Sequence, residues 1–364
     1  MNDRHLDRVE RAGREAEERG VDALIVSPSP DLSYLTGYDP MPLPRPTLLV
    51  IRPHADLAML VPELERPLAA ASVEDRVRLV AWRDGSDPYA AAASLLDGAE
   101  RIAVADRLWG VHLLGLQREL PDASFSAASD VLARLRAVKD PDELEALRRA
   151  ARAADETFRR ILEVAFEGRR EDEVAGDLAE LLVENGHTRA AFTIVAGGPN
   201  GASPHHEPGG RAIRPGDAVV MDFGGELAGY LSDTTRTVVV GEPPDGFEAA
   251  YAAVQEAQSA AVDAVRPGVV AQDLDRTARG ILDAAGFGDR FIHRTGHGIG
   301  LELHEPPYIV RGDETVLEPG MTFSIEPGVY LDGRFGIRIE DIVAVTADGV
   351  ERLNRSTRDL QVVT

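Results

Sequence analysis

The first third of the chain alternates short apolar runs with segments that have helical spacing. Residues 21–26 form a mostly apolar run that stops at Ser27 and Pro28, which is typical of a buried strand followed by a turn. We expect the same structure for four later runs and a helix for each of two segments between them. The further strands are predicted at 47–51, 57–61, 77–82 and 101–105, and the helices at 88–96 and 111–120. This alternation predicts an α/β domain with a mixed or parallel sheet.

The pattern changes near residue 139. Asp140 is followed by Pro141 and then by two acidic residues. This order is typical of the start of a helix, because aspartate caps the first turn and proline fits its first position. A long helix is expected from there to about Phe166. We therefore predict an N-terminal α/β domain at residues 1–138 and a second domain at residues 139–364.

The second domain contains an internal repeat. Residues 168–186 and 268–286 both begin and end on glycine, and Leu182 and Leu282 fall at the same place in each. Any two amphipathic helices that end at a glycine share some of these features. Each segment is followed, however, by a predicted β-hairpin that carries two carboxylates. We therefore favour a duplicated half-domain, which gives an α+β fold with a pseudo-two-fold repeat.

The two hairpins place four acidic residues in comparable positions. Asp222 and Asp233 are equidistant from the middle of a turn at 226–229, and Glu326 and Glu340 are equidistant from the middle of the second turn. Cross-strand partners hold their Cβ atoms ~5 Å apart on one face, so we expect each pair to face across its hairpin. If the pseudo-two-fold axis brings the hairpins together, four carboxylates crowd into one pocket.

Four neighbouring carboxylates repel one another, and divalent cations are the natural compensation. Oxygen ligands favour Mn²⁺, whereas an imidazole shifts the preference toward Co²⁺ or Zn²⁺. His297, in the glycine-rich stretch 295–300, supplies one imidazole. Facing acids in a single hairpin are more often a solvated face. Two such pairs among apolar residues, with His297 between them, favour a metal site. The glycines also imitate a nucleotide-binding loop, but the spacing and the following acid of such a loop are absent.

The composition excludes several classes of function. The formal net charge of −23 argues against a nucleic-acid partner, because phosphate binding needs basic surfaces. The chain has no cysteine, which excludes disulfides, a thiolate nucleophile and cysteine-ligated zinc. No apolar run approaches the ~20 residues that span a bilayer, and the charged N-terminal stretch predicts no export signal. We therefore expect a cytoplasmic protein with no membrane partner.

Six short motifs follow one another between Lys139 and the C-terminus. They are Pro204-His205, Asp222-Phe223-Gly224, 232–237, His297-Gly298-Ile299-Gly300-Leu301 with His304-Glu305, 325–328 and 338–341. Their order and spacing resemble those of the pita-bread metallopeptidase family, which includes prolidase, aminopeptidase P and methionine aminopeptidase. The N-terminal domain is also similar to the extra domain of prolidase, aminopeptidase P and creatinase, which methionine aminopeptidases generally lack.

The resemblance implies a site for two divalent metal ions. It implies that Asp222 is a bidentate ligand of one ion and that Asp233 and Glu340 bridge both. It further implies that His297 and Glu326 are the remaining ligands of the second ion. Glu326 is in addition the expected proton shuttle between a water molecule and the leaving proline nitrogen.

The resemblance also assigns residues around the metals. His205 and His304 match histidines that contact the substrate near the scissile amide, and His293 matches a further active-site histidine of the prolidase and aminopeptidase P branch. Arg338, two residues before Glu340, is expected to pair with a ligand carboxylate, although an ordinary salt bridge within the strand explains it nearly as well.

The implied activity is that of an Xaa-Pro exopeptidase that acts on small proline-containing peptides as a homodimer. Some prolidases carry an arginine, suited to gripping a dipeptide's carboxylate, at the position of Tyr308. This difference weakens the expectation of dipeptide specificity. Arg45, in the proline-rich loop 41–46, is a candidate replacement that would act across a dimer, and a solvated loop arginine is the alternative.

On balance we expect cleavage of dipeptides. Aminopeptidase P activity on longer Xaa-Pro peptides is the first alternative. A metal-free creatinase-like hydrolase and a non-catalytic pita-bread binding module are two further ones.

Overall fold

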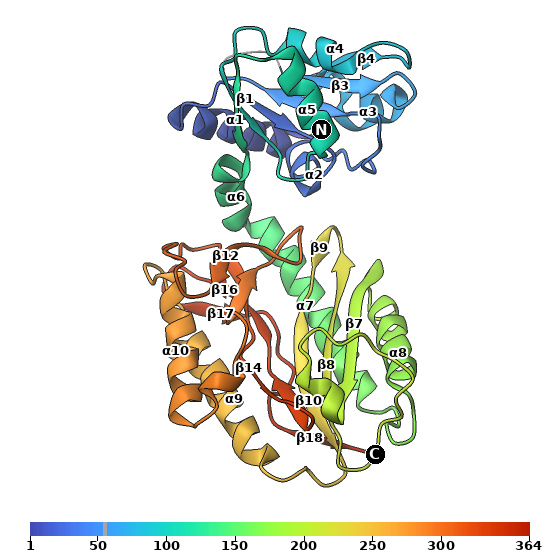
Figure 1. The fold of residues 1–364 in the computed structure, drawn as a ribbon, viewed down its shortest axis with the longest axis vertical. Helices are drawn as coiled ribbons and strands as arrows, with labels where there is room; N and C mark the ends of the chain where they lie inside the picture. The colour runs from blue at the N-terminus through green and yellow to red at the C-terminus, as the bar shows by residue number, and fades with distance from the viewer. Residues whose placement is uncertain (54–56) are drawn as a thin grey trace. The chain divides into compact units, whose positions relative to one another are not determined.

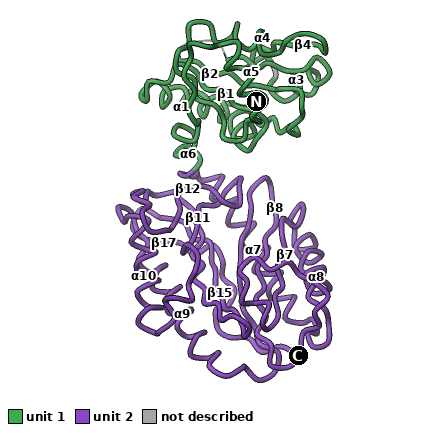
Figure 2. Tube along the Cα trace, viewed as in Figure 1, with its two compact units in different colours: residues 1–136 green, residues 137–364 purple. Residues whose placement is uncertain are grey.

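The computed structural model describes residues 1–53 and 57–364 (Figure 1). They form two compact units, Met1–Arg136 and Ala137–Thr364 (Figure 2). The division between the units falls two residues before the boundary expected from the sequence.

The N-terminal unit is built on a mixed sheet whose strand order is β4-β3-β2-β1-β5-β6. The described strands are β1 (Ala23–Val26), β2 (Leu48–Ile51), β3 (Ala58–Pro62), β4 (Arg78–Trp82), β5 (Arg101–Val104) and β6 (Ser124–Ala127). In its centre β1 runs antiparallel to β2 and parallel to β5. The sequence predicted the first five strands. It missed β6, because that strand is short, polar at two of its four positions and mostly exposed.

Short helices accompany this sheet. They are α1 (Asp3–Glu18), α2 (Pro30–Thr36), α3 (Arg66–Val73), α4 (Pro88–Leu95), α5 (Gly110–Glu119) and α6 (Ser129–Ala137), with a 3₁₀ turn at Glu74–Arg76. The predicted helices at 88–96 and 111–120 correspond to α4 and α5. Asp87 caps α4 by accepting a hydrogen bond from Tyr89 N at 2.8 Å. Among the described residues, no helix combines the length and the apolar character that crossing a membrane requires.

The first half of the C-terminal unit begins with α7 (Pro141–Ile161). As predicted, Asp140 caps it, and Glu143 Oε2 accepts a hydrogen bond from Asp140 N at 2.9 Å. The prediction that α7 reaches Phe166 was wrong, because i→i−3 hydrogen bonds at Glu163 and Val164 end it earlier. The half continues with α8 (Glu171–Glu184), β7 (Arg189–Gly197), a 3₁₀ turn at Gly198–Ala202, β8 (Ala218–Leu227), β9 (Tyr230–Leu231) and β10 (Thr234–Val240), and its sheet also takes in β18 (Gln361–Val363).

The second half repeats this plan. Two helices precede a sheet of order β12-β11-β13-β16-β17 and a separate hairpin of β14 and β15. Its elements are α9 (Phe247–Asp263), α10 (Ala271–Ala284), a 3₁₀ turn at Gly288–Arg290, β11 (Gly296–Gly298), β12 (Glu305–Ile309), β13 (Thr322–Ile325), β14 (Gly328–Leu331), β15 (Phe335–Arg338), β16 (Asp341–Val345) and β17 (Val350–Arg352). In Figure 1, α9 and α10 lie on one side of the strands of this unit and α8 lies on the other.

The pseudo-two-fold repeat predicted from the sequence is confirmed. The repeated segments form α8 and α10, and Leu182 and Leu282 are both fully buried. An isolated β-bridge precedes each helix at an equivalent place, Arg170 with Ala212 and Val270 with Val316. Each half therefore buries its own helix pair against its own strands, and the hairpins of the two halves meet between them.

The register of the first hairpin differs from the prediction. Asp222 lies opposite Thr235, not opposite Asp233. The turn consists of Ala228 and Gly229, both with positive φ, and so it is shorter and later than the turn assumed at 226–229. In the second hairpin, Ile325 pairs with Asp341 and Gly328 with Arg338. That register places Glu326 opposite Glu340, as predicted.

Candidate metal centre

Four acidic residues reach the centre from breaks or ends of strands rather than from their middles, with one exception. Asp222 lies within β8, whereas Asp233 lies between β9 and β10. Glu326 follows β13, and Glu340 lies between β15 and β16. These short interruptions free the side chains from strict alternation, so both halves of the repeat direct carboxylates to the same place.

His297 lies in the middle of β11, which has β12 on one side and β13 on the other. The glycines on either side of His297 allow this close packing. A Cβ atom at Gly296 would clash with the carbonyl oxygen of Ser324, and one at Gly298 would clash with that of Pro306. The glycine-rich stretch therefore serves to insert a histidine between two strands.

The side chains of Asp233, His297 and Glu340 form a tight buried group. One ligand atom from each lies within 4.8 Å of the others. His297 Nε2 lies 3.6 Å from Asp233 Oδ2 and 3.3 Å from Glu326 Oε1. Asp222 stands outside this tight group but lines the same cavity. The structure thus brings all five predicted ligands to one cavity and packs three of them closely.

Burial makes the negative charge of this group costly. Burial first, and then the carboxylates of Glu340 and Asp222, raise the pKa of Asp233 well above its ordinary value. Burial and the charges of Glu326 and Asp222 do the same to the pKa of Glu340. Burial also raises the pKa of Glu326 to about 7. A positive charge placed among these groups would reverse the shifts.

Two carboxylate oxygens of the group lack a hydrogen-bond partner among the described residues. They are Asp222 Oδ1 and Glu340 Oε1, and both are buried. Their companion oxygens are held by hydrogen bonds, since Arg338 donates to Asp222 Oδ2 and Thr235 donates to Glu340 Oε2, each at 2.6 Å. Buried polar atoms are normally satisfied. Two oriented and unsatisfied oxygens therefore fit metal ligation.

The imidazole of His297 is in the tautomer that leaves a lone pair on Nε2, the atom that could bind a metal ion. Its Nδ1 lies 3.1 Å from the carbonyl oxygen of Gly298, which requires the proton on Nδ1 and leaves the Nε2 lone pair directed at the acids. Burial, followed by the charge of His304, lowers the pKa of His297 to about 3. A neutral imidazole beside carboxylates is a donor set suited to Mn²⁺, Co²⁺ or Zn²⁺.

A second layer of side chains surrounds the ligands. Arg338 joins Asp222 to Tyr330, because its Nη1 donates to Tyr330 OH at 2.8 Å. Tyr330 OH in turn lies 2.8 Å from His293 Nε2. Burial, then the charge of Arg338, lowers the pKa of His293 to about 3, so this imidazole is neutral and accepts the hydroxyl proton. These hydrogen bonds, which run from His293 through Tyr330 and Arg338 to Asp222, fix the orientation of a predicted ligand carboxylate.

His205 and His304 complete the part of the site that faces the cavity. The ring of His304 lies 4.1 Å from the ring of His297, edge to face. Both residues line a cavity of about 490 Å³ together with the five predicted ligands. A cavity of this size takes a small ligand.

Two models of protein families match the chain. One, described as Metallopeptidase family M24, matches residues 145–347, and the other, described as Creatinase/Prolidase N-terminal domain, matches residues 8–138. The chain belongs to metallopeptidase family M24. The resemblance noted in the sequence is therefore confirmed, as are the two fold classes that it implied.

Similar M24 proteins match over nearly their whole length. A protein of Mycobacterium tuberculosis named Probable dipeptidase PepE is 45% identical over 362 residues, which cover 98% of this chain and 96% of that protein. An Xaa-Pro dipeptidase of Lactobacillus delbrueckii is 37% identical over 355 residues, covering 95% and 96%. The crystal structure of dipeptidase PepE from Mycobacterium ulcerans has a TM-score of 0.96 at 43% identity, covering 99% and 98%. The chain is thus a hydrolase of the metallopeptidase class, and membership of M24 implies a divalent metal.

Two predicted site residues lie elsewhere. Tyr308 is not among the residues that line the cavity; it is the cross-strand partner of His297 in the pairing of β11 with β12. Arg45 belongs to the N-terminal unit, where its exposed guanidinium forms an ion pair of 2.6 Å with Asp84.

Sequence reasoning missed several residues of the M24 site. Tyr330 and Arg294 carry polar groups into it, and three apolar residues line its wall, namely Phe192, Ile194 and Leu303. Arg294 stands between His293 and His297, so its place next to two assigned histidines was the available signal. The apolar residues have no sequence signal of their own, because any strand facing a core looks the same.

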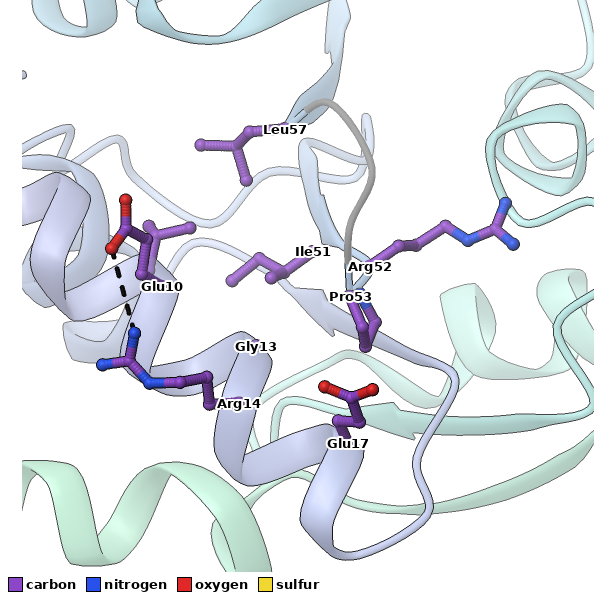
Figure 3. Close-up of a pocket in the computed structure, with 9 residues that line it drawn as sticks. Glu10, Gly13, Arg14, Glu17, Ile51, Arg52, Pro53 and Leu57 are labelled. Carbon is purple, nitrogen blue, oxygen red and sulfur yellow. Dashed lines mark ion pairs between the residues drawn. The ribbon is translucent and has the colours of Figure 1, made fainter.

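A second cavity, of about 420 Å³, lies in the N-terminal unit between α1 and the end of β2 (Figure 3). Glu10 and Arg14 form an ion pair across its rim at 3.9 Å. The described residues that line it include no histidine, and apart from the charged side chains of α1 and Arg52 its wall is apolar. Its two acidic residues, Glu10 and Glu17, are exposed, unlike the acids of the metal centre.

Proposed function

We propose that this M24 protein is a dinuclear-metal exopeptidase that hydrolyses the Xaa-Pro bond of dipeptides. The observation that carries the proposal is the buried group of Asp233, His297 and Glu340 in a cavity that also holds Asp222 and Glu326. The names of the relatives support it: two are called dipeptidases, and a third is called an Xaa-Pro dipeptidase.

The five ligands divide between two ions in this proposal. Asp222 would hold one ion, His297 and Glu326 would hold the other, and Asp233 and Glu340 would serve both. Mn²⁺ is the proposed metal, with Co²⁺ or Zn²⁺ as alternatives, because carboxylates dominate the ligand set. When bound, such a pair acidifies a water molecule at neutral pH and polarises the scissile carbonyl.

Glu326 is the proposed proton shuttle. Burial keeps the proton affinity of its carboxyl high, with a pKa of about 7, while bound cations would oppose that shift. A carboxyl group whose pKa is raised by burial and lowered by cations can keep that pKa near neutral pH. It can then accept a proton from the attacking water and deliver it to the leaving proline nitrogen.

The histidines take the remaining roles in the proposal. His304, in edge contact with His297, donates to the oxygen on which negative charge develops during attack. His205 contacts the substrate near the scissile amide. His293 is instead a positioning residue, since it is linked by hydrogen bonds through Tyr330 and Arg338 to Asp222.

Two of the alternative functions do not explain the two buried carboxylate oxygens that lack a hydrogen-bond partner among the described residues. A metal-free creatinase-like hydrolase and a non-catalytic binding module would both have to bury Asp222 Oδ1 and Glu340 Oε1 without a partner. Aminopeptidase P activity has no such difficulty, because it uses the same chemistry on longer peptides.

Selectivity for dipeptides requires a group that binds the free carboxylate or blocks longer chains. Arg45 is one proposal for this contact, acting at the site of a second copy in a homodimer. The ion pair between Arg45 and Asp84 would have to open for that contact to form.

The test is a comparison of cleavage rates for Ala-Pro, Ala-Pro-Ala and Ala-Ala with Mn²⁺, Co²⁺ or Zn²⁺ added to metal-free protein. We expect Ala-Pro to be cleaved fastest and Mn²⁺ to support the highest rate. Equal rates for Ala-Pro and Ala-Pro-Ala would replace the dipeptidase assignment by aminopeptidase P. Equal rates for Ala-Pro and Ala-Ala would remove the proline requirement.

A further inference from the structure

Two arginines line the cavity of the metal centre, and they differ in their partners. Arg338 is buried and donates to Asp222 Oδ2, Tyr330 OH and Thr235 Oγ1. Its charge is therefore committed to holding a ligand. Arg294 is partly exposed, and among the described residues no carboxylate lies within ion-pair distance of its guanidinium. It is the cavity's available cation.

The aromatic ring of Tyr308 fixes the place of that cation. Arg294 Cζ lies 4.8 Å from the centroid of the Tyr308 ring, a cation–π contact that leaves the guanidinium edge free to donate. Tyr308 is also the cross-strand partner of His297. The stack therefore holds the guanidinium beside the strand that carries a proposed metal ligand, at the wall of the cavity.

A guanidinium without an acidic partner in such a wall is suited to a ligand carboxylate. Arginine binds a carboxylate through two parallel N–H···O bonds, which adds geometric selection to charge. A dipeptide offers one such group, its C-terminal carboxylate, whereas its α-ammonium group would be repelled by Arg294. In a longer Xaa-Pro peptide the same atoms form a neutral amide, and the chain continues beyond them.

We propose that Arg294, held against Tyr308, binds the free carboxylate of the dipeptide and thereby makes the site selective for dipeptides. The inference rests on the proposed function and deepens it. It assigns the contact to a residue of the same unit as the metal centre and requires no ion pair to open, unlike the rival assignment to Arg45.

The test compares Ala-Pro with Ala-Pro amide, which lacks the negative charge, on the Mn²⁺-loaded enzyme. The Arg294→Met variant removes the charge and keeps the length of the side chain. We expect its KM for Ala-Pro to rise by about tenfold or more, with kcat and the KM for Ala-Pro amide changed less than about twofold. Arg294→Lys should fall between, because it keeps the charge and loses the paired donors.

Two further variants separate the contact from a general loss of charge or packing. Tyr308→Leu removes the ring and should raise the KM for Ala-Pro selectively, whereas Tyr308→Phe keeps the ring and should raise that KM less than Tyr308→Leu does. Arg311→Met removes an exposed arginine nearby in the chain and should change neither KM. Metal content and thermal unfolding of each variant show whether it folds and loads normally.

Four results would overturn the inference. The first is an equal loss on the acid and the amide by Arg294→Met. The second is a loss that depends on the residue before proline, seen by comparing Glu-Pro with Lys-Pro. The third is retained preference for the acid in Arg294→Met combined with its loss in Arg45→Ala. If the wild type cleaves neither substrate, the proposed function fails and the inference fails with it.

Discussion

The charge of the buried carboxylates is the main electrostatic problem of the catalytic unit at the scale of single residues. Asp233 and Glu340 have pKa values raised by burial and by their acidic neighbours, and Glu326 is raised to about 7. Ions that bind here must displace the protons that otherwise neutralise the group. Metal binding and pH should therefore be coupled.

The first prediction concerns this coupling. The pKa of Glu326 rises on folding from its ordinary 4.5 to about 7. The stability that protonation gives the metal-free protein is thus lost as pH rises through that window. The gain in Tm on adding Mn²⁺ should be larger at about pH 8 than at about pH 5.5, because protons compete with the metal only at the lower pH. Thermal unfolding with and without Mn²⁺ measures this, and an equal gain at both pH values would contradict it.

The second prediction concerns Glu326. Glu326→Gln keeps the shape of the side chain but removes both the charge of a proposed ligand and the proposed shuttle. We expect kcat for Ala-Pro to fall by at least about 100-fold. Steady-state kinetics at saturating Mn²⁺ measure the loss. A kcat within a few fold of the wild type would show that proton transfer does not pass through this residue.

The third prediction separates His304 from the ligands. His304→Ala removes a ring in contact with His297 but no proposed ligand. We expect kcat to fall by about 100-fold or more, as for other groups that stabilise a developing oxyanion, while the metal content stays that of the wild type. Loss of metal in this variant would place His304 among the ligands and reject its assigned role.

At the scale of elements, the sequence predicted what local physics dictates. The start of α7 was predicted from Asp140 and Pro141. The repeat was predicted from the glycines that flank the segments of α8 and α10. The register of paired strands was harder to predict from the sequence. The predicted register of the first hairpin was wrong because its turn requires a positive φ at Ala228, and an alanine in the sequence does not indicate that conformation.

The residues of the site also divide into those that the sequence predicted and those that depend on the tertiary structure. The proposed ligands were named from motifs, because metal chemistry restricts the residue types that can serve. The roles of Arg294, Tyr330 and the apolar wall residues could not be predicted in this way, because they depend on which strands become neighbours. The stack of Arg294 on Tyr308 exists only once β11 has paired with β12.

The fourth prediction belongs to α7. Asp140 Oδ1 accepts from Asp142 N and Glu143 N, both at 3.0 Å. Asp140→Ala should lower the free energy of unfolding of the C-terminal unit by about 1 kcal/mol. Urea unfolding followed by circular dichroism should detect the change. Both tryptophans, Trp82 and Trp109, lie in the N-terminal unit, so an unchanged fluorescence transition is the internal control. An unchanged dichroism transition would show that the cap contributes nothing.

At the scale of the whole molecule, the residues of the proposed catalytic site all belong to one unit. All five proposed ligands, the three histidines around them and both cavity arginines lie in Ala137–Thr364. The N-terminal unit, which matches the Creatinase/Prolidase N-terminal domain, contributes Arg45 as the rival carboxylate contact. The homodimer and the cytoplasmic location expected from the sequence stay predictions.

The central claim is that this M24 protein cleaves Xaa-Pro dipeptides with two metal ions. It is tested most directly by measuring bound metal and the rate of Ala-Pro cleavage on the same samples, before chelation, after chelation and during titration with Mn²⁺. The account predicts no activity without metal, and a rate that recovers as Mn²⁺ binds and reaches its maximum at about two ions per chain. Full activity in protein shown to be free of metal would contradict it.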